Sequence, residues 1–404
     1  MKVLQINSVC GNGSTGRLVV QISNYLDQCG VENAIAYGFG ASARPNAFRF
    51  GNGLDAHLHS FLSRKLCWQG KASHVSTYRL LSYMNRFRPD IVHLHNIHGH
   101  YLNYKMLFQY LKQKNCEVVW TFHDCWPITG KCAHFTEVQC QKWKTGCFDC
   151  PQLNRYPDSV RDRSRKNYWE KKNAFTSLHD LHIVTVSHWL ESIVRESFLG
   201  GQDIRCIYNG VDTHLFSPQI SSIRQKHHLQ GKFVILSAAS VWNHQKGLDR
   251  FLALSRVLKD DEAIVLIGVT PVQKEDLPEN VIGIPVIHSQ TVLAQWYTAA
   301  DVYLSFSMEE TFGLTVAEAM ACGTPAVVMD STACPEVLGK NTGFAVDLQN
   351  TDTVLSALRQ IKANGKDAYS PSCQARIADS FSLEAMQQAY LKLYQSIRSQ
   401  HEPV

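Results

Sequence analysis

Two glutamates, Glu310 and Glu318, stand eight residues apart around a short apolar segment, and their spacing suggests ligand binding. Carboxylates accept hydrogen bonds from hydroxyl groups, of which sugars carry several. Gly313 lies between them, and a residue without a side chain lets a ligand approach the backbone closely. The pattern therefore indicates a site for a polyhydroxylated ligand. The alternative is a solvated helix start with two surface glutamates.

Apolar runs around this segment predict a strand, a helix and a second strand. Residues 301–305 and 326–329 favour strands, and residues 314–321 have the apolar spacing of a helix that packs on a sheet. The start of such a helix presents unpaired backbone N–H groups and roughly half a positive charge. We therefore expect it to bind a diphosphate without a metal ion.

From residue 309 the segment reads EETFGLTVAEAMACGTP, which resembles the donor-site signature of the retaining nucleotide-sugar glycosyltransferases of family 4. These enzymes have the GT-B fold. The resemblance implies that Glu310 contacts the transferred sugar and takes part in catalysis, and that Glu318 contacts the ribose of the donor. The residues that it places at the donor diphosphate are Thr311, Phe312, Gly313 and Leu314.

Length and composition agree with the architecture that the resemblance implies. The chain has 404 residues, of which 45% are hydrophobic and 19% are charged, so it can form two cores. We expect an α/β protein with two doubly wound Rossmann-like domains facing each other across a cleft. The expected parts are an acceptor-binding domain over residues 1–200, a nucleotide-sugar-binding domain over residues 201–380 and a helix over residues 381–404 that crosses back to the first domain.

A glycine-rich loop near the start of the chain is a candidate phosphate-binding element. It separates a strand over residues 3–7 from a helix, and its glycines have the spacing G-x-G-x-x-G, which is weak evidence by itself. By resemblance, Gly16 and Arg17 are expected near the donor phosphate or the acceptor.

A second loop follows a strand over residues 233–238. By resemblance, Lys246 in this loop binds the diphosphate, since an ammonium group pairs with phosphate oxygens. The arginine that family members have here is missing, because residues 240–242 are Ser, Val and Trp. Arg17 and His244 are the candidates to replace it.

Two strands of the first half, over residues 91–94 and 118–122, deliver polar residues at their carboxyl ends, where ligands of open α/β sheets bind. The first ends in a run of four histidines, for which we prefer hydrogen-bonded strand-end residues over a metal site. The resemblance places His123 beside the reacting sugar as a catalytic residue. The residues assigned to the acceptor side are His95, Asn96, Asp124 and Trp126.

Residues 125–151 form a cysteine-rich segment that resembles the colanic-acid and capsule branch of the family. Four of its cysteines have the spacing C-x7-C-x6-C-x2-C, which would suit a structural zinc ion. Reduced cysteines in a loop are the alternative. The expected zinc ligands are Cys132, Cys140, Cys147 and Cys150.

Cysteine usage and charge bear on the compartment and the partners. Thirteen cysteines, an odd number, and a polar first segment predict a cytoplasmic protein, and no apolar run is long enough to span a membrane. A net charge of +5 does not by itself predict a nucleic-acid partner. Basic and aromatic side chains gather in residues 155–172, which suits peripheral binding to the inner face of the cytoplasmic membrane; a solvated helix face is equally compatible.

These expectations predict a retaining transferase that moves a hexose from a UDP- or GDP-sugar to a lipid-linked saccharide during surface polysaccharide assembly. The helix start and Lys246 would stabilise the leaving diphosphate, so catalysis would need no cofactor. No carboxylate is an obvious nucleophile, which favours transfer on the leaving-group face. The alternatives are a sugar-nucleotide epimerase on the same fold and a zinc-bearing adaptor without enzymatic activity.

Overall fold

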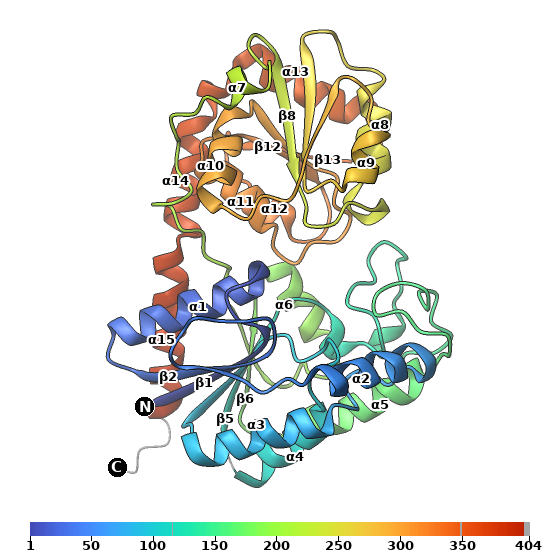
Figure 1. Cartoon of the computed structure of the whole chain (residues 1–404), viewed down its shortest axis with the longest axis vertical. Coiled ribbons are helices and arrows are strands. Elements are labelled where there is room, and N and C mark those ends of the chain that lie inside the picture. Colours follow the sequence, from blue (N-terminus) through green and yellow to red (C-terminus); the bar gives the residue numbers. More distant parts are fainter. Residues whose placement is uncertain (115, 348–349, 400–404) are drawn as a thin grey trace. The chain divides into compact units, whose positions relative to one another are not determined.

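The computed structural model describes residues 1–114, 116–347 and 350–399, and the chain divides into two compact units (Figure 1). Unit 1 comprises Met1–Tyr208 together with Gln387–Val404, and unit 2 comprises Asn209–Met386. Each unit contains one parallel sheet with helices packed on it. The predicted α/β class with two Rossmann-like domains is therefore confirmed.

The sheet of unit 1 has seven parallel strands in the order β3-β2-β1-β4-β5-β6-β7. The strands are β1 (Lys2–Val9), β2 (Glu32–Phe39), β3 (Ala47–Arg49), β4 (Ile91–Leu94), β5 (Glu117–Phe122), β6 (Leu181–Thr185) and β7 (Asp203–Cys206). The longer helices are α1 (Gly13–Gln28), α2 (Gly53–Leu66), α3 (His74–Phe87), α4 (Tyr104–Lys114), α5 (Ser164–Phe175), α6 (His188–Arg195) and α15 (Leu383–Ser399). The direction of winding changes between β1 and β4, and ligands of doubly wound sheets bind at the carboxyl ends of the strands beside such a point.

The sheet of unit 2 has six parallel strands in the order β10-β9-β8-β11-β12-β13. The strands are β8 (Phe233–Ala238), β9 (Glu262–Ile267), β10 (Val281–Ile284), β11 (Val302–Ser305), β12 (Ala326–Met329) and β13 (Gly343–Val346). The helices are α7 (Ile223–Lys226), α8 (Leu248–Ser255), α9 (Pro271–Glu275), α10 (Gln290–Ala299), α11 (Leu314–Ala321), α12 (Cys334–Val337), α13 (Thr351–Asn364) and α14 (Ser370–Ser380). The change of winding lies between β8 and β11, so it falls between the Lys246 loop and the Glu310 segment.

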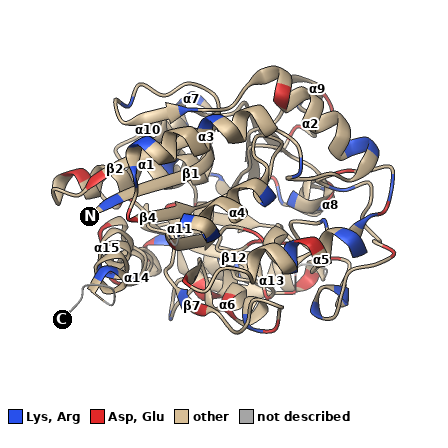
Figure 2. Cartoon of the chain, turned by 90° about the horizontal axis from the view of Figure 1, so that it is seen from below, with Lys and Arg blue, Asp and Glu red and all other residues tan. Residues whose placement is uncertain are grey.

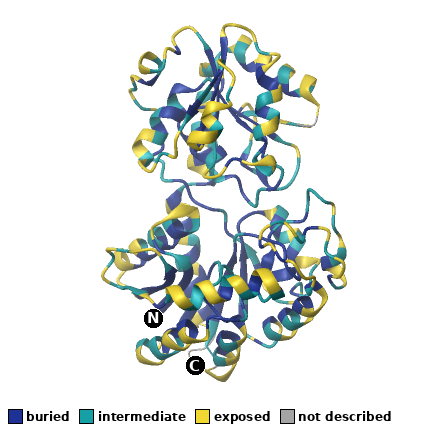
Figure 3. Ribbon diagram, turned by 45° about the vertical axis from the view of Figure 1, so that its right-hand side comes forward, coloured by how far each residue is buried: buried dark blue, intermediate teal, exposed yellow. Residues whose placement is uncertain are grey.

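Burial explains why the strands read as apolar runs. All residues of β4 and β9 are buried, as expected for parallel strands covered on both faces (Figure 3). Basic and acidic side chains are spread over many elements of both units (Figure 2), which agrees with the small net charge. None of the described helices is both long enough and apolar enough to cross a membrane.

The domain boundaries differ from those expected. A boundary after residue 200 would separate β7 from its own sheet, whereas β7 pairs with β6 and the unit continues to Tyr208. Unit 2 continues to Met386, beyond the expected end at residue 380. Of the segment predicted over residues 381–404, the last five residues lie outside the described part of the chain.

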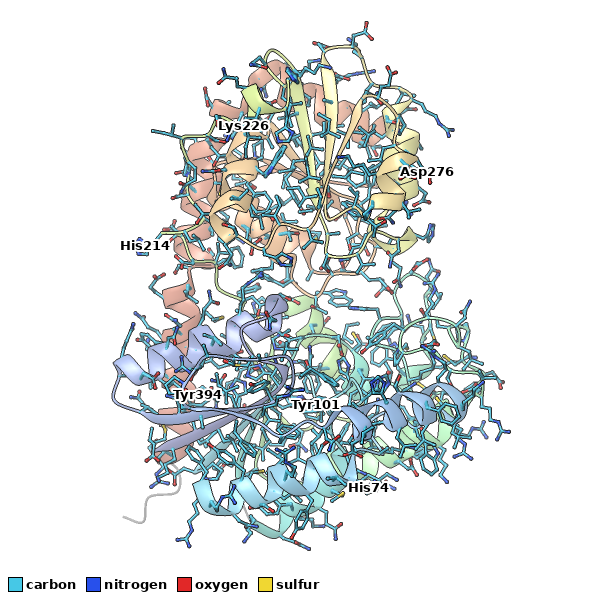
Figure 4. The ribbon with its side chains drawn as sticks, viewed as in Figure 1. His74, Tyr101, His214, Lys226, Asp276 and Tyr394 are labelled. Atoms are coloured by element: carbon cyan, nitrogen blue, oxygen red, sulfur yellow. The ribbon has the colours of Figure 1, made fainter. Side chains whose placement is uncertain are left out.

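The C-terminal helix α15 returns to unit 1, as predicted. The hydroxyl group of Tyr394, which Figure 4 labels, lies 2.6 Å from Nδ1 of His93 on β4. Gln387 donates a hydrogen bond to the backbone oxygen of Gln21 on α1 (2.9 Å), and Arg398 pairs with Asp90 (2.9 Å). These polar contacts, together with one between Tyr390 and Thr121 on β5 (2.9 Å), bind this helix to the sheet and to α1.

Candidate active site

The segment between β11 and α11 in unit 2 contains the residues predicted to bind the donor. Gly313 is the N-cap of α11 and has a φ of +97°, a conformation that side-chain-bearing residues rarely adopt. A Cβ atom at Gly313 would also lie 3.2 Å from Sγ of Cys334. The glycine therefore lets α11 begin at Leu314, directly after the loop that follows β11. The first N–H groups of a helix have no partner within the helix.

Lys246 and Glu310 form an ion pair at this edge, with Nζ 2.5 Å from Oε1. Nζ also donates to Oγ of Ser307 (3.2 Å). The negative charge of Glu310 raises the pKa of Lys246, so the ammonium group stays charged. The structure thus brings the predicted phosphate-binding lysine and the predicted sugar-binding glutamate together. The side chain of Lys246 is 39% exposed and that of Glu310 is 24% exposed.

Backbone geometry holds Lys246 in place. The side chain of Asn243 accepts a hydrogen bond from the backbone N–H of Lys246 (3.0 Å). Gly247 has a φ of +75°, and a Cβ atom there would lie 2.3 Å from Cβ of Phe306. The Lys246 loop therefore packs directly on the segment that carries Glu310.

Glu318 and Phe312 lie deeper than their predicted roles suggest. Glu318 is only 3% exposed and accepts a hydrogen bond from the hydroxyl group of Tyr297 (3.1 Å). The ring of Phe312 is buried against Phe381, with the ring centroids 5.5 Å apart. The side chain of Phe312 is therefore part of the core, and only its backbone amide fits the predicted role. The ribose contact of Glu318 stays a prediction.

The loop that lacks the expected arginine is anchored by a tryptophan. Trp242 is 4% exposed, and its Nε1 donates to the backbone oxygen of Ile267 (2.9 Å). His244, one candidate for the missing cation, pairs with Asp249 (3.0 Å). Asp249 therefore balances any positive charge on His244.

Arg250 is a candidate cation that sequence analysis missed. Its Nη2 lies 3.5 Å from Sδ of Met308, and its Nη1 is buried without a hydrogen-bond partner among the described residues. It lines a cavity of about 380 Å³ together with Ala253, Leu254, Phe306, Met308, Thr351 and Val354. Its position four residues after Lys246 was visible in the sequence, but only folding brings it beside Met308 of the donor segment.

The glycine-rich loop of unit 1 forms a tight turn into α1. The backbone N–H of Gly11 donates to the oxygen of Gly16 (3.0 Å), and a Cβ atom at Gly16 would lie 3.0 Å from Cγ2 of Val9. Arg17 is half-buried in the first turns of α1. The predicted roles of Gly16 and Arg17 at the donor phosphate or the acceptor stay predictions.

The other predicted residues of unit 1 meet at the carboxyl ends of β4 and β5. His123 and all four residues assigned to the acceptor side border the same narrow space, which is too small for a water molecule; the four are His95, Asn96, Asp124 and Trp126. Asn96 and His123 are half-buried at this edge, whereas the other three are buried. The structure brings these residues together, and their exposure separates them into two groups; their roles stay predictions.

His95 does not face the acceptor side, contrary to the prediction. It is 2% exposed, and its Nδ1 lies 3.1 Å from Nε2 of His123. Strand alternation turns it to the same side as His93, whose ring centroid lies 4.0 Å away. His93 in turn contacts Thr121 (2.8 Å) and Tyr394 (2.6 Å). The preference for hydrogen-bonded histidines over a metal site agrees with these partners.

Asp124 is held by a histidine and a backbone amide. Its Oδ2 lies 2.7 Å from Nε2 of His98, and its Oδ1 accepts from the backbone N–H of Trp126 (2.8 Å). Burial opposes the charged form, but these two partners outweigh it and lower the pKa of Asp124 to about 2. Asp124 is therefore a charged carboxylate whose oxygens already orient the loop after β5.

Trp126 is a core residue and not an acceptor contact, which corrects a second prediction. Its side chain is 0% exposed. Nζ of the buried Lys171 lies 3.4 Å from its ring centroid and donates to the backbone oxygens of Trp126 (2.6 Å) and Thr129 (3.0 Å). The cation–π contact and the two hydrogen bonds compensate for burying this lysine.

The four cysteines of the predicted zinc site do not form a preformed metal site. Among the described residues, ligand atoms meet within 4.8 Å only for His188, Glu191 and Cys206. There, Glu191 also binds Arg195 (3.0 Å), which competes with a cation. Without a metal ion, burial raises the pKa of Cys132 to about 12 and that of Cys147 to about 11.

Buried lysines organise the cysteine-rich segment and part of the basic stretch that follows it. Nζ of Lys131 donates to the backbone oxygens of Gln152 (2.8 Å) and Arg155 (2.9 Å). Arg155 pairs with Glu137 (2.8 Å), and Lys171 is internal. Residues 155–172 are therefore not one continuous basic surface.

Comparisons with known proteins identify both halves of the chain. The family described as "Glycosyltransferase Family 4" matches residues 15–215, and "Glycosyl transferases group 1" matches residues 232–364. WcaC of Escherichia coli K12, named as a colanic acid biosynthesis glycosyl transferase, is 24% identical over 98% of this chain and 100% of its own length. A GDP-mannose-dependent α-(1-6)-phosphatidylinositol dimannoside mannosyltransferase of Mycobacterium tuberculosis is 28% identical over 46% of this chain and 51% of its own.

A solved structure shares the fold. HepE of Anabaena, in complex with UDP-glucose, has a TM-score of 0.68 at 16% sequence identity, and the similarity covers 98% of this chain and 100% of that one. At this identity the similarity concerns the fold alone.

The ion pair between Lys246 and Glu310 leads to a test in two variants. Replacing Glu310 with Gln removes the charge that competes for Lys246, so UDP or GDP is expected to bind more tightly, by up to about 1 kcal/mol for a partly exposed pair. Replacing Lys246 with Met is expected to weaken the same binding by about 1.5 to 3 kcal/mol. Isothermal titration calorimetry measures both.

Glu279→Gln is the matched control, because it removes an exposed negative charge of the same unit just before β10, at the opposite edge of the parallel sheet from Lys246. It is expected to leave nucleotide affinity unchanged. Equal affinities for the Lys246→Met variant and the unaltered protein would contradict the assignment.

Proposed function

Because the chain belongs to the glycosyltransferases of family 4, we propose that it is a retaining enzyme that transfers a hexose from a nucleotide-diphosphate sugar to a lipid-linked saccharide. The observation that carries the proposal is the ion pair of Lys246 and Glu310 beside the start of α11. This arrangement offers a cation and helix amides to a diphosphate and a carboxylate to a sugar hydroxyl.

In unit 2, these residues assist the departure of the leaving group. As the bond to the sugar breaks, negative charge accumulates on the diphosphate. The ammonium group of Lys246 and the first-turn amides of α11 are already oriented, so they stabilise this charge without reorganisation. A metal ion is then not required for departure.

Glu310 has a second role in this scheme. When the diphosphate takes over Lys246, the carboxylate of Glu310 becomes available to accept hydrogen bonds from hydroxyl groups of the transferred sugar. Binding of the donor thus replaces one ion pair within the protein by two contacts with the donor, one from Lys246 and one from Glu310. Retention follows from attack on the leaving-group face, which needs no protein nucleophile.

The surface-polysaccharide role of relatives supports the choice of acceptor. WcaC is named for colanic acid biosynthesis, and the mycobacterial relative acts on a phosphatidylinositol dimannoside. Growing chains of this kind are carried by lipids, so an acceptor of this class would lie at a membrane surface.

Exposed apolar side chains of unit 1 would suit such a surface better than residues 155–172. On α2, Leu54, Leu58 and Phe61 are 82%, 56% and 59% exposed, and their spacing places them on one face of the helix. Arg64 and Lys65 lie in the last turn of the same helix. Apolar side chains beside basic ones favour an anionic bilayer.

Nucleotide recognition tests the proposed function. UDP, GDP and a panel of their sugars are expected to raise the melting temperature of the purified protein, because ligands that bind only the folded state stabilise it. The same panel is expected to reveal slow hydrolysis of the correct donor. If none of these ligands raised the melting temperature, the proposal would fail.

Membrane binding is tested by flotation with vesicles. Replacing Leu58 and Phe61 with Ser is expected to reduce binding to vesicles that contain anionic lipid, and added salt is expected to reduce it as well, since the Debye length shrinks. The control is Ile220→Ser, which removes a fully exposed apolar side chain of unit 2 (102% exposed). Unchanged flotation of the α2 variant would argue against this surface.

A structural zinc ion stays a prediction that rests on the spacing of the four cysteines. Four cysteine ligands hold one zinc ion, so a preparation of the reduced protein is expected to contain about one zinc ion per chain. Binding would have to draw the four thiol groups together. Metal analysis checks the value, with Cys29→Ser as the control because that exposed cysteine lies outside the segment. A metal-free, fully active preparation would remove the prediction.

A further inference from the structure

Gln5, His95 and His123 form a chain of side chains across three neighbouring strands of unit 1. Oε1 of Gln5 lies 3.2 Å from Nε2 of His95, and Nδ1 of His95 lies 3.1 Å from Nε2 of His123. Gln5 and His95 are buried, at 0% and 2% exposure, whereas His123 is half-buried at the carboxyl edge of the sheet. The chain therefore runs from the interior to the predicted catalytic histidine.

The direction of each hydrogen bond follows from the innermost residue. Nε2 of Gln5 donates to the backbone oxygen of Val19 (3.1 Å), so the side-chain oxygen of Gln5 is the atom that faces His95. An amide oxygen only accepts, and hence Nε2 of His95 carries a hydrogen. Burial lowers the pKa of His95 well below its usual value, so the ring is neutral and its Nδ1 is an acceptor. Nε2 of His123 must then carry the hydrogen that this bond requires.

We propose that Gln5 and His95 are positioning residues that hold His123 as the Nε2–H tautomer, in which Nδ1 is the acceptor nitrogen of the ring. This inference rests on the proposed function, since it concerns the same histidine. An imidazole in water interconverts between tautomers of similar energy, and in the other tautomer Nδ1 would be a donor. The buried chain removes this freedom.

The surroundings of the chain keep both rings uncharged. The ring of His93 packs on His95, and Tyr390 and Tyr394 of α15 pack on His93. Asp124 raises and His98 lowers the pKa of His123, and these two residues lie within hydrogen-bond distance of each other (2.7 Å). Burial dominates and lowers the pKa of His123 to about 4. At neutral pH His123 is therefore uncharged, and in the Nε2–H tautomer its Nδ1 is an acceptor.

The first experiment compares two replacements of His95. Leu has no acceptor for His123, whereas the side-chain oxygen of Asn takes the place of Nδ1. His95→Leu is expected to lower kcat/KM about tenfold, which corresponds to one lost hydrogen bond, mainly through kcat. His95→Asn is expected to stay within about threefold of the unaltered enzyme. Equal losses in both variants would indicate a merely structural role for His95.

The tautomer itself is read by long-range ¹H–¹⁵N NMR of the imidazole rings in the folded, full-length protein. The expected spectrum shows His95 and His123 both protonated at Nε2 and bare at Nδ1. In His95→Leu, His123 is expected to populate both tautomers. A spectrum of the unaltered protein with the hydrogen on Nδ1 of His123 would overturn the proposal. This measurement needs no turnover, so its outcome is separate from that of the proposed function.

Gln5→Glu gives a pH test with a defined sign. A carboxylate facing Nε2 of His95 raises the pKa of that ring. At a pH below the raised pKa, Nδ1 of His95 carries a hydrogen that faces the Nε2–H group of His123, and two donors repel each other. Activity is therefore expected to fall as the pH decreases through the raised pKa of His95. The unaltered enzyme is expected to show no such acid limb until near the pKa of His123, about 4.

The double variant Gln5→Glu, His95→Asn is the matched control, because Asn does not titrate. It is expected to lose the acid limb of the single variant. An acid limb that persists in the double variant would assign the effect to another group and contradict the proposed chain.

Discussion

A buried imidazole needs a hydrogen-bond partner at each nitrogen, and much of unit 1 is arranged around this requirement. Gln5, His93, His95 and Thr121 lie on one side of three adjacent strands, where a parallel sheet would ordinarily be apolar. Each of them is paired, and the partners include Tyr390 and Tyr394 from the end of the chain. The C-terminal helix thus hydrogen-bonds to Thr121 and His93, and the ring of His93 packs on His95, which contacts the catalytic candidate His123.

In unit 2 the corresponding constraint is charge balance. Lys246 is held at the carboxyl edge by an asparagine cap and a left-handed glycine, and Glu310 neutralises it. A site without a cation would not attract a ligand that carries two negatively charged phosphate groups. The pair balances both charges in the absence of a ligand, and in the proposed function the donor diphosphate replaces Glu310 as the partner of Lys246.

The cysteine-rich segment illustrates how irregular backbone is stabilised without regular elements. Lys131 and Lys171 are each 1% exposed, and both donate hydrogen bonds to backbone oxygens of this region. These carbonyl groups have no helix or sheet to pair them, and buried carbonyl groups without donors are costly. The two lysines supply the donors from within the core.

The sequence by itself determined the fold class, the family and the order of the main elements, because these depend on local periodicity and on contiguous motifs. The strand over residues 91–94 and the helix over residues 314–321 lie where they were predicted. The amphipathic pattern of α15 predicted a helix with one packed face, whereas its return to unit 1 was expected only from the family resemblance. Only the tertiary structure decided which motif residues are accessible. His95 and Trp126 are buried, and Arg250 reaches Met308, since side-chain burial depends on partners distant in the chain. The tautomer of His123 depends on Gln5, which no local pattern connects to it.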